Sequence, residues 1–93
     1  MKLSICICTY NRAEILKETL TSVYSHQGNH VEIEVLVINN NSSDHTLQVC
    51  SKFAESYLNF RVETEYEQGL SFARNRAIIE ASSDWICYLD DDA

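Results

Sequence analysis

The stretch Trp85-Ile-Cys-Tyr-Leu-Asp-Asp-Asp92 joins an apolar run to three successive carboxylates. An apolar run that ends at a charge cluster is typical of a central strand that delivers polar side chains to the carboxyl edge of a sheet. In open α/β sheets, ligands bind at that edge. Asp90 and Asp92 alternate along the chain, so together they can hold a hard divalent cation such as Mg2+ or Mn2+, which takes oxygen ligands. Taken alone, the triplet is equally compatible with a solvated turn or a helix cap.

The composition is that of one small globular domain. The chain has 93 residues, of which 45% are hydrophobic and 23% charged, enough for one modest core. Its net charge of −7 argues against a nucleic-acid partner, because binding along phosphates needs a basic face. No apolar stretch approaches the roughly 18 residues of a membrane span. We therefore expect a cytoplasmic chain, and a longer parent protein that can be peripheral to the inner face of the membrane.

Strand-like and helix-like patterns alternate along the whole chain. The strands are expected at 3–8, 32–38, 60–64 and 85–89, and the helices after residue 12, at about 45–57 and at about 71–82. This β-α-β-α-β-α-β series predicts an α/β, Rossmann-like and mostly parallel sheet with flanking helices and right-handed crossovers. The charges of the third strand predict an edge position for it. Asn11 with Glu14 resembles a capping box for the first helix.

Small and apolar residues predict which faces of the later helices are buried. The second helix is expected to bury the stripe Leu47, Cys50, Ala54 and Tyr57. The third helix repeats Ala73, Ala77 and Ala81, which would let it lie close to the sheet. The chain stops on the acidic cluster, without a closing helix. We therefore expect a domain truncated at its C-terminus, whose uncovered apolar surface favours homo-oligomers.

Polar loops follow three of the predicted strands and should project from one edge of the sheet. They are 9–12, 39–44 and 90–92, and Arg74 lies nearby in the first turn of the third helix. Hydroxyl, amide, guanidinium and carboxylate groups at one rim suit a polar, phosphorylated ligand. No glycine-rich phosphate loop follows the first strand, so the charge of a diphosphate would have to be met by a cation and by side chains.

Each of these features also has a purely structural explanation. The loops after the first two strands can serve as helix caps, with Ser43 or Asp44 capping the second helix. Arg74 could form a surface ion pair with Glu67 or Glu80. The joint occurrence of these groups at one predicted rim favours a binding site.

Four segments resemble successive signatures of the family 2, GT-A-type glycosyltransferases. They are Ser4-Ile-Cys-Ile-Cys-Thr-Tyr-Asn-Arg12, Val35-Leu-Val-Ile-Asn-Asn-Asn-Ser-Ser-Asp-His-Thr46, Gly69-Leu-Ser-Phe-Ala-Arg-Asn75 and Tyr88-Leu-Asp-Asp-Asp92. The resemblance covers essentially the whole chain. It implies that residues 1–93 form the nucleotide-sugar-binding part of a GT-A domain. It also implies metal-dependent, inverting transfer from a nucleotide-sugar donor, a UDP-sugar, to the hydroxyl of a saccharide or lipid-linked acceptor.

The resemblance also implies roles for individual residues. The nucleotide-sugar-binding residues would be Thr9, Tyr10, Asn11, Asn39, Arg74, Asp90 and Asp91. Asp92 and Asp90 would hold Mg2+ or Mn2+ as an Asp-x-Asp motif. Asn39 stands where the family usually has an aspartate that contacts the base, which bears on uridine preference. The catalytic base is expected beyond residue 93, so the chain alone should bind nucleotide without turnover.

Two other functions remain open on the sequence. A nucleotidyltransferase-like enzyme would need a glycine- and lysine-rich loop after the first strand. The loop at 9–12 contains neither glycine nor lysine. A non-catalytic α/β module could use the acidic rim to bind a cation or a basic partner.

Overall fold

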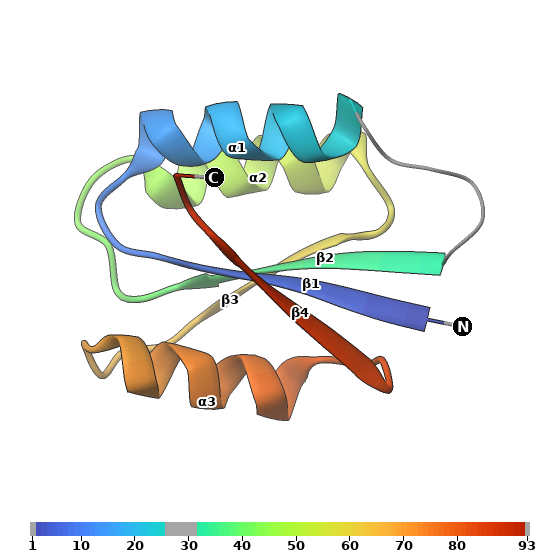
Figure 1. Ribbon diagram of the computed structural model, residues 1–93. Helices are drawn as coiled ribbons and strands as arrows, with labels where there is room; N and C mark the ends of the chain where they lie inside the picture. The colour runs from blue at the N-terminus through green and yellow to red at the C-terminus, as the bar shows by residue number, and fades with distance from the viewer. Residues whose placement is uncertain (1, 26–31, 93) are drawn as a thin grey trace.

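The computed structural model describes residues 2–25 and 32–92, in which strands and helices alternate as predicted. The elements are β1 (Lys2–Thr9), α1 (Ala13–Ser25), β2 (Glu32–Asn39), α2 (Thr46–Ser56), β3 (Phe60–Thr64), α3 (Leu70–Glu80) and β4 (Trp85–Asp90). The strands pair in parallel in the order β3-β2-β1-β4. Helices α1 and α2 cover one face of the sheet, and α3 covers the other (Figure 1). The predicted α/β fold with a parallel sheet is confirmed, and β3 lies at an edge.

The two faces of the sheet build two separate cores, because side chains alternate along each strand. On the α1/α2 face, Ile7, Val35 and Val37 pack with Leu16 and Leu20 of α1. The α3 face buries a second cluster, which consists of Cys6, Leu36, Ile38, Ala73 and Ala77. The predicted alanine repeat thus places α3 against the sheet, with Ala81 partly buried at its end.

The buried face of α2 differs from the predicted stripe. Leu47 is 47% exposed, whereas Thr46, Val49 and Cys50 are buried. Phe53 packs against the core from the same side. Ala54 and Tyr57 of the predicted stripe are also exposed, so Cys50 is the one residue of the stripe that is buried. The position of the sheet, rather than side-chain hydropathy, decides which face is covered.

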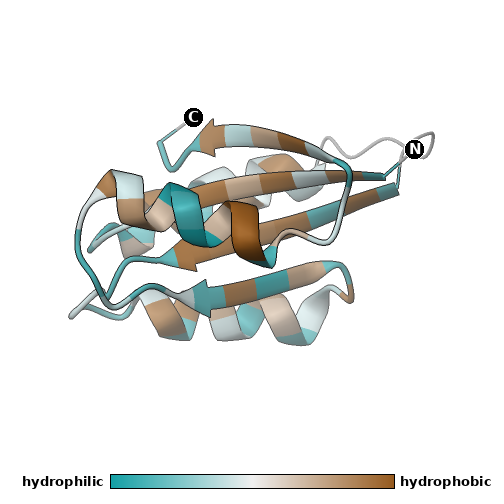
Figure 2. Cartoon of the chain, turned by 90° about the horizontal axis from the view of Figure 1, so that it is seen from below, coloured by the Kyte–Doolittle hydropathy of each residue, from teal (hydrophilic) through white to brown (hydrophobic). Residues whose placement is uncertain are grey.

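Strand β4 is an edge strand among the described residues, which corrects the prediction of a buried central strand. It pairs only with β1. Figure 2 shows α3 lying across the middle of the sheet, with β4 beside it and uncovered. Tyr88, which lies on this face, is 42% exposed, and Trp85, which lies on the α1/α2 face of the same strand, is 62% exposed. The apolar sequence of a strand does not reveal whether a second strand pairs with each of its edges.

No helix in the described part of the chain is long and apolar enough to cross a membrane.

Candidate functional site

The ends of β1, β2 and β4 lie level with one another at the carboxyl edge of the sheet. Thr9 pairs with Asn39 in the register of β1 and β2, and Cys8 pairs with Asp90 in that of β1 and β4. The loops that follow these strands are therefore brought together, as the sequence predicted. Their side chains divide between the two faces of the sheet.

Asn11 joins the loop after β1 to the loop after β2. Its side-chain carbonyl accepts the backbone N–H groups of Ser43, at 2.7 Å, and Asp44, at 3.2 Å. Its own N–H donates to the hydroxyl of Ser42 at 3.0 Å. Asn11 has a φ of 51°, in the left-handed region that asparagine tolerates. The predicted capping box is wrong, because the side chain of Asn11 is directed to the other loop rather than to the N-terminus of α1.

Asp44 serves the first turns of two helices. Its carboxylate accepts the backbone N–H and the hydroxyl of Thr46, and also the backbone N–H of Ala13 at 3.3 Å. Burial raises the pKa of Asp44, but these hydrogen bonds outweigh it and hold the pKa below its usual 3.8. The N-cap of α2 is His45, which makes no side-chain cap hydrogen bond, so neither predicted residue occupies that position. Asp44 lies one residue before the N-cap, where it accepts the first N–H of α2 and supports α1 as well.

Asn39 and Asn40 have different tasks in the loop after β2. Asn39 is 4% exposed, and its side-chain oxygen accepts the N–H of Ser42 at 3.1 Å. Asn40 donates to the carbonyls of Glu65 and Glu67 and accepts the N–H of Gly69 at 2.9 Å. It thereby connects the end of β2 to the residue that precedes α3. The sequence analysis missed Asn40, for which the run of asparagines was the available signal.

Asp91 is turned toward α1 and is held by three groups. Thr9 donates its hydroxyl to the carboxylate at 3.1 Å, and Arg12 pairs with the carboxylate at 3.0 Å. The hydroxyl of Thr19 donates to the backbone carbonyl of Asp91 at 2.7 Å. The side chain of Asp91 is only 12% exposed. The middle carboxylate of the triplet thus fixes the end of β4 against β1 and α1.

A cavity of about 470 Å3 lies at this edge of the sheet, bounded by β1, β4 and α3. Tyr10, Arg74, Asp90 and Asp92 contribute to its lining. Its walls also include Cys6 and Cys8, and burial raises the pKa of Cys6 to about 11. Burial likewise raises the pKa of Cys8, so both thiols stay protonated near neutral pH. We call this space the edge cavity.

Arg74 is available to a ligand in the edge cavity. Its guanidinium lies 5.8 Å from the centre of the Tyr88 ring, and the Tyr88 hydroxyl donates to the Arg74 carbonyl at 3.4 Å. Within residues 2–25 and 32–92, no carboxylate forms an ion pair with Arg74. Glu80, one of the expected partners, instead pairs with Arg61 and Arg76. Because α3 begins at Leu70, Arg74 opens the second turn rather than lying in the first.

The predicted site residues fall into two groups. Tyr10, Arg74, Asp90, Asp91 and Asp92 line the edge cavity. Thr9, Asn11 and Asn39 do not line it; they hold the surrounding loops through the hydrogen bonds described above. The sequence analysis assigned no binding role to Arg12, Leu70 and Tyr88, which also line the cavity, although each lies within one of the four quoted segments.

The carboxylates of Asp90 and Asp92 match the ligands that a hard cation prefers. Neither makes a hydrogen bond within the described chain, and only Asp92 has an ion-pair neighbour, Arg12 at 3.7 Å. In the same residues no group of three His, Cys, Asp or Glu side chains gathers to form a complete protein site. Mg2+ is commonly held by one or two carboxylates together with substrate phosphates and water. The residues present therefore fit a cation that is shared with a diphosphate.

The chain is similar to known glycosyltransferases in both sequence and structure. The model of the family described as Glycosyl transferase family 2 matches residues 4–93. The uncharacterized glycosyltransferase MG060 of Mycoplasma genitalium is 32% identical over 99% of this chain and 32% of its own length. The mannosyltransferase PcManGT from Pyrobaculum calidifontis, solved with GDP-Man and Mn2+, superposes with a TM-score of 0.88 at 26% identity, covering 98% of this chain and 27% of that protein.

A second solved structure gives a similar result. TarS from S. aureus (residues 1–349), in complex with UDP-GlcNAc, superposes with a TM-score of 0.82 at 29% identity. The match covers 99% of this chain and 27% of that one. The chain thus spans about a third or less of the length of each of these proteins.

Proposed function

The chain belongs to glycosyl transferase family 2, and from that membership we propose that it forms the donor-binding part of a glycosyltransferase. The enzyme would transfer a sugar from a nucleoside-diphosphate sugar to the hydroxyl of a saccharide or lipid-linked acceptor. One observation carries the proposal: the edge cavity is lined by Arg74 together with Asp90 and Asp92. A guanidinium and carboxylates that can hold a cation are the groups required to bind a diphosphate.

Asp90 and Asp92 would hold Mg2+ or Mn2+ in this proposal. A bound cation would act as a Lewis acid that offsets the charge of the departing diphosphate. Arg74 would bind the nucleotide diphosphate through its N–H groups. The ring of Tyr88, over which the guanidinium lies, would keep it in position. Asp91 would keep the end of β4 in place through its bonds to Thr9 and Arg12.

The proposed reaction inverts the configuration of the sugar. The acceptor oxygen bonds to the anomeric carbon from the face opposite the diphosphate, and the bond from that carbon to the diphosphate oxygen breaks. We propose that the acceptor proton passes to a carboxylate in a part of the enzyme that follows residue 93. We therefore propose that these residues alone bind nucleotide without turnover.

We propose UDP as the nucleotide of the donor. Asn39 is the residue that the family resemblance connects with this choice, although it does not itself line the edge cavity. It retains an acceptor oxygen where the family usually has an aspartate, but that oxygen already accepts the N–H of Ser42. Its amide group adds donors that an aspartate lacks. UDP and GDP should therefore be compared directly.

Calorimetric titration of the chain with UDP and GDP, with and without Mn2+, tests the proposal. We expect weak UDP binding that Mn2+ strengthens about ten-fold or more, equivalent to about 1.4 kcal/mol. Cation binding with no effect on either nucleotide would contradict it and favour a cation-binding module. Binding of a nucleoside triphosphate in preference to the diphosphates would favour a nucleotidyltransferase. Sugar transfer by the chain alone would contradict the location of the base.

A further inference from the structure

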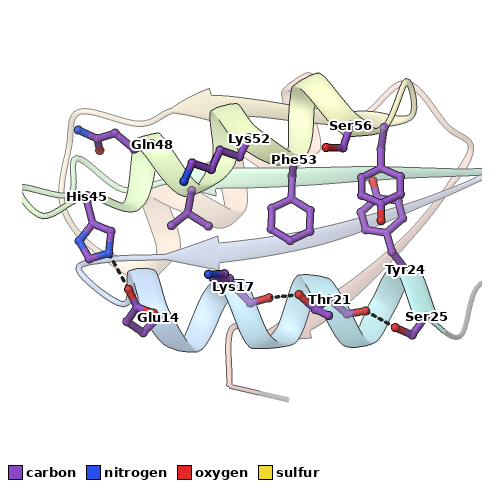
Figure 3. Close-up of a pocket in the computed structure, with 12 residues that line it drawn as sticks. Glu14, Lys17, Thr21, Tyr24, Ser25, His45, Gln48, Lys52, Phe53 and Ser56 are labelled. Carbon is purple, nitrogen blue, oxygen red and sulfur yellow. Dashed lines mark hydrogen bonds and ion pairs between the residues drawn. The ribbon is translucent and has the colours of Figure 1, made fainter.

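A second cavity, of about 430 Å3, lies between α1 and α2 on the opposite side of the sheet from α3. We call it the helical groove. Its lining includes Val49 and, labelled in Figure 3, Lys17, Thr21, Tyr24, Lys52 and Phe53. It shares no lining residue with the edge cavity. Its volume lies within the range of about 300–1,000 Å3 that small-molecule sites usually have.

The helical groove carries positive charge on both walls. Lys17 of α1 and Lys52 of α2 extend from opposing helices toward the space between them (Figure 3). In residues 2–25 and 32–92, neither ammonium group pairs with a carboxylate, although acidic residues outnumber Lys and Arg by 14 to 7. By contrast, Arg61 and Arg76 are both paired with glutamates. Lys17 and Lys52 thus bring two ammonium groups without carboxylate partners to the lining of one cavity.

The acidic residue of the groove does not neutralise these lysines. Glu14 accepts a hydrogen bond from, or pairs with, the ring of His45, with its oxygen 2.8 Å from Nε2. This contact joins α1 to the residue before α2 and closes one end of the groove (Figure 3). The carboxylate is thus directed to His45 rather than to the ammonium groups, and the centre of the groove remains cationic.

The other end of the groove is aromatic. The rings of Tyr24 and Tyr57 are stacked 3.7 Å apart at 10°, and Phe53 lies 6.1 Å from each of them. The Tyr24 hydroxyl donates to Asn59 at 3.1 Å, which fixes its ring. Val49, only 8% exposed, completes an apolar floor. The Tyr24–Tyr57 stack also joins the two helices, so the groove is bounded at both ends and suits a small molecule better than a peptide helix.

We propose that the helical groove binds a small amphipathic anion of the aryl phosphate or aryl carboxylate class. The anionic group would lie between the ammonium groups of Lys17 and Lys52. The ring would lie on Val49 and Phe53 toward the tyrosine stack, where aromatic groups prefer offset or edge-to-face contacts. Charge complementarity and the apolar floor are both required, so neither a neutral ring nor a simple anion should bind equally well.

The test is an amide-detected NMR titration of the full chain with 1-naphthyl phosphate, without divalent cations. We expect shifts confined to α1 and α2. The neutral 1-naphthol and inorganic phosphate should each bind at least about ten-fold more weakly. Equal binding of either compound would overturn the proposal, as would shifts confined to β4 or α3.

Matched variants locate the anion. In the double variant Lys17→Gln/Lys52→Gln, binding should weaken about ten-fold or more. Lys2→Gln, which removes an ammonium group that contacts Ser82 instead, should leave binding unchanged. Equal effects of these variants would contradict the proposal. Circular dichroism verifies that each variant is folded, and unchanged UDP binding separates this site from the edge cavity.

Discussion

The side-chain carbonyl of Asn11 accepts the backbone N–H of Ser43 at 2.7 Å. This bond joins loops that follow neighbouring strands, and Tyr10 and Arg12 on either side of Asn11 line the edge cavity. Asn11 therefore acts on the cavity through the position of its neighbours. The backbone of Asn11 is in the left-handed region. Glycine and alanine both remove its side chain, but only glycine adopts this backbone without strain, so the two substitutions separate the two effects on stability.

Asn11→Ala should destabilise the chain more than Asn11→Gly. Both variants remove the acceptor for Ser43 and Asp44, but only alanine also places a Cβ at a φ of 51°. Left-handed geometry costs about 1–2 kcal/mol for residues other than glycine and asparagine. Urea unfolding followed by far-UV circular dichroism should therefore show a difference of about 1 kcal/mol. Equal unfolding free energies would show that the loop relaxes around the new residue.

Arg74→Ala should weaken UDP binding by about ten-fold to a hundred-fold, since a charge-assisted hydrogen bond contributes about 1.5–3 kcal/mol. Arg74→Lys should recover only part of that loss, because an ammonium group lacks the bidentate fork. The matched control for Arg74→Lys is Arg76→Lys. The guanidinium of Arg76 pairs with Glu65 and Glu80 and does not line the cavity. If Arg76→Lys weakened UDP binding as much as Arg74→Ala, the assignment of Arg74 would be wrong.

The three carboxylates at the end of β4 should respond differently to substitution. Asp90→Asn and Asp92→Asn should abolish the Mn2+ enhancement of UDP binding with little change in stability. Asp91→Ala should lower the unfolding free energy by about 1–3 kcal/mol, because it leaves the Thr9 hydroxyl and Arg12 without their acceptor.

Calorimetry and urea unfolding of the same variants separate these effects. Asp84→Asn, an exposed acid before β4, is the control for general loss of negative charge. A loss of Mn2+ enhancement in this control would exclude a specific role for Asp90 and Asp92.

Glu34 should make stability depend on pH in the acidic range. Burial raises the pKa of Glu34. Hydrogen bonds from Ser4 and Ser82 lower it, as does the charge of Arg61, and together they hold the pKa below its usual 4.5. The stabilisation is therefore complete above the unfolded-state pKa and is lost as the pH falls through the lower, folded-state pKa. Glu34→Gln should flatten this acid dependence of the unfolding free energy. An unchanged slope below about pH 5 would assign the acid sensitivity to other carboxylates.

Periodicity was sufficient to predict the order of the elements, and the parallel sheet then explained why Thr9, Asn39 and Asp90 lie at one edge. It could not predict which face of the sheet each loop side chain would occupy. All three carboxylates border the cavity, for example, but only Asp91 accepts hydrogen bonds from Thr9 and Arg12. That division follows from the alternation of side chains and from hydrogen bonds between residues distant in sequence.

The helical groove lay beyond the reach of the sequence analysis for a similar reason. Lys17 and Lys52 look like ordinary solvated helix residues when each helix is considered alone. Their common direction depends on the packing of α1 beside α2, which the aromatic stack of Tyr24 and Tyr57 fixes. Missing ion pairs can be recognised only when all potential partners have been placed.

The exposed position of Trp85 on β4 has a spectroscopic consequence. It is the single tryptophan of the chain and is 62% exposed in the native fold. Its fluorescence should therefore have a long-wavelength maximum before unfolding and change little as the core melts. Docking of another strand or surface over β4 would shift the emission to the blue, so this one indole reports on the occupancy of the sheet edge independently of the folding of the rest.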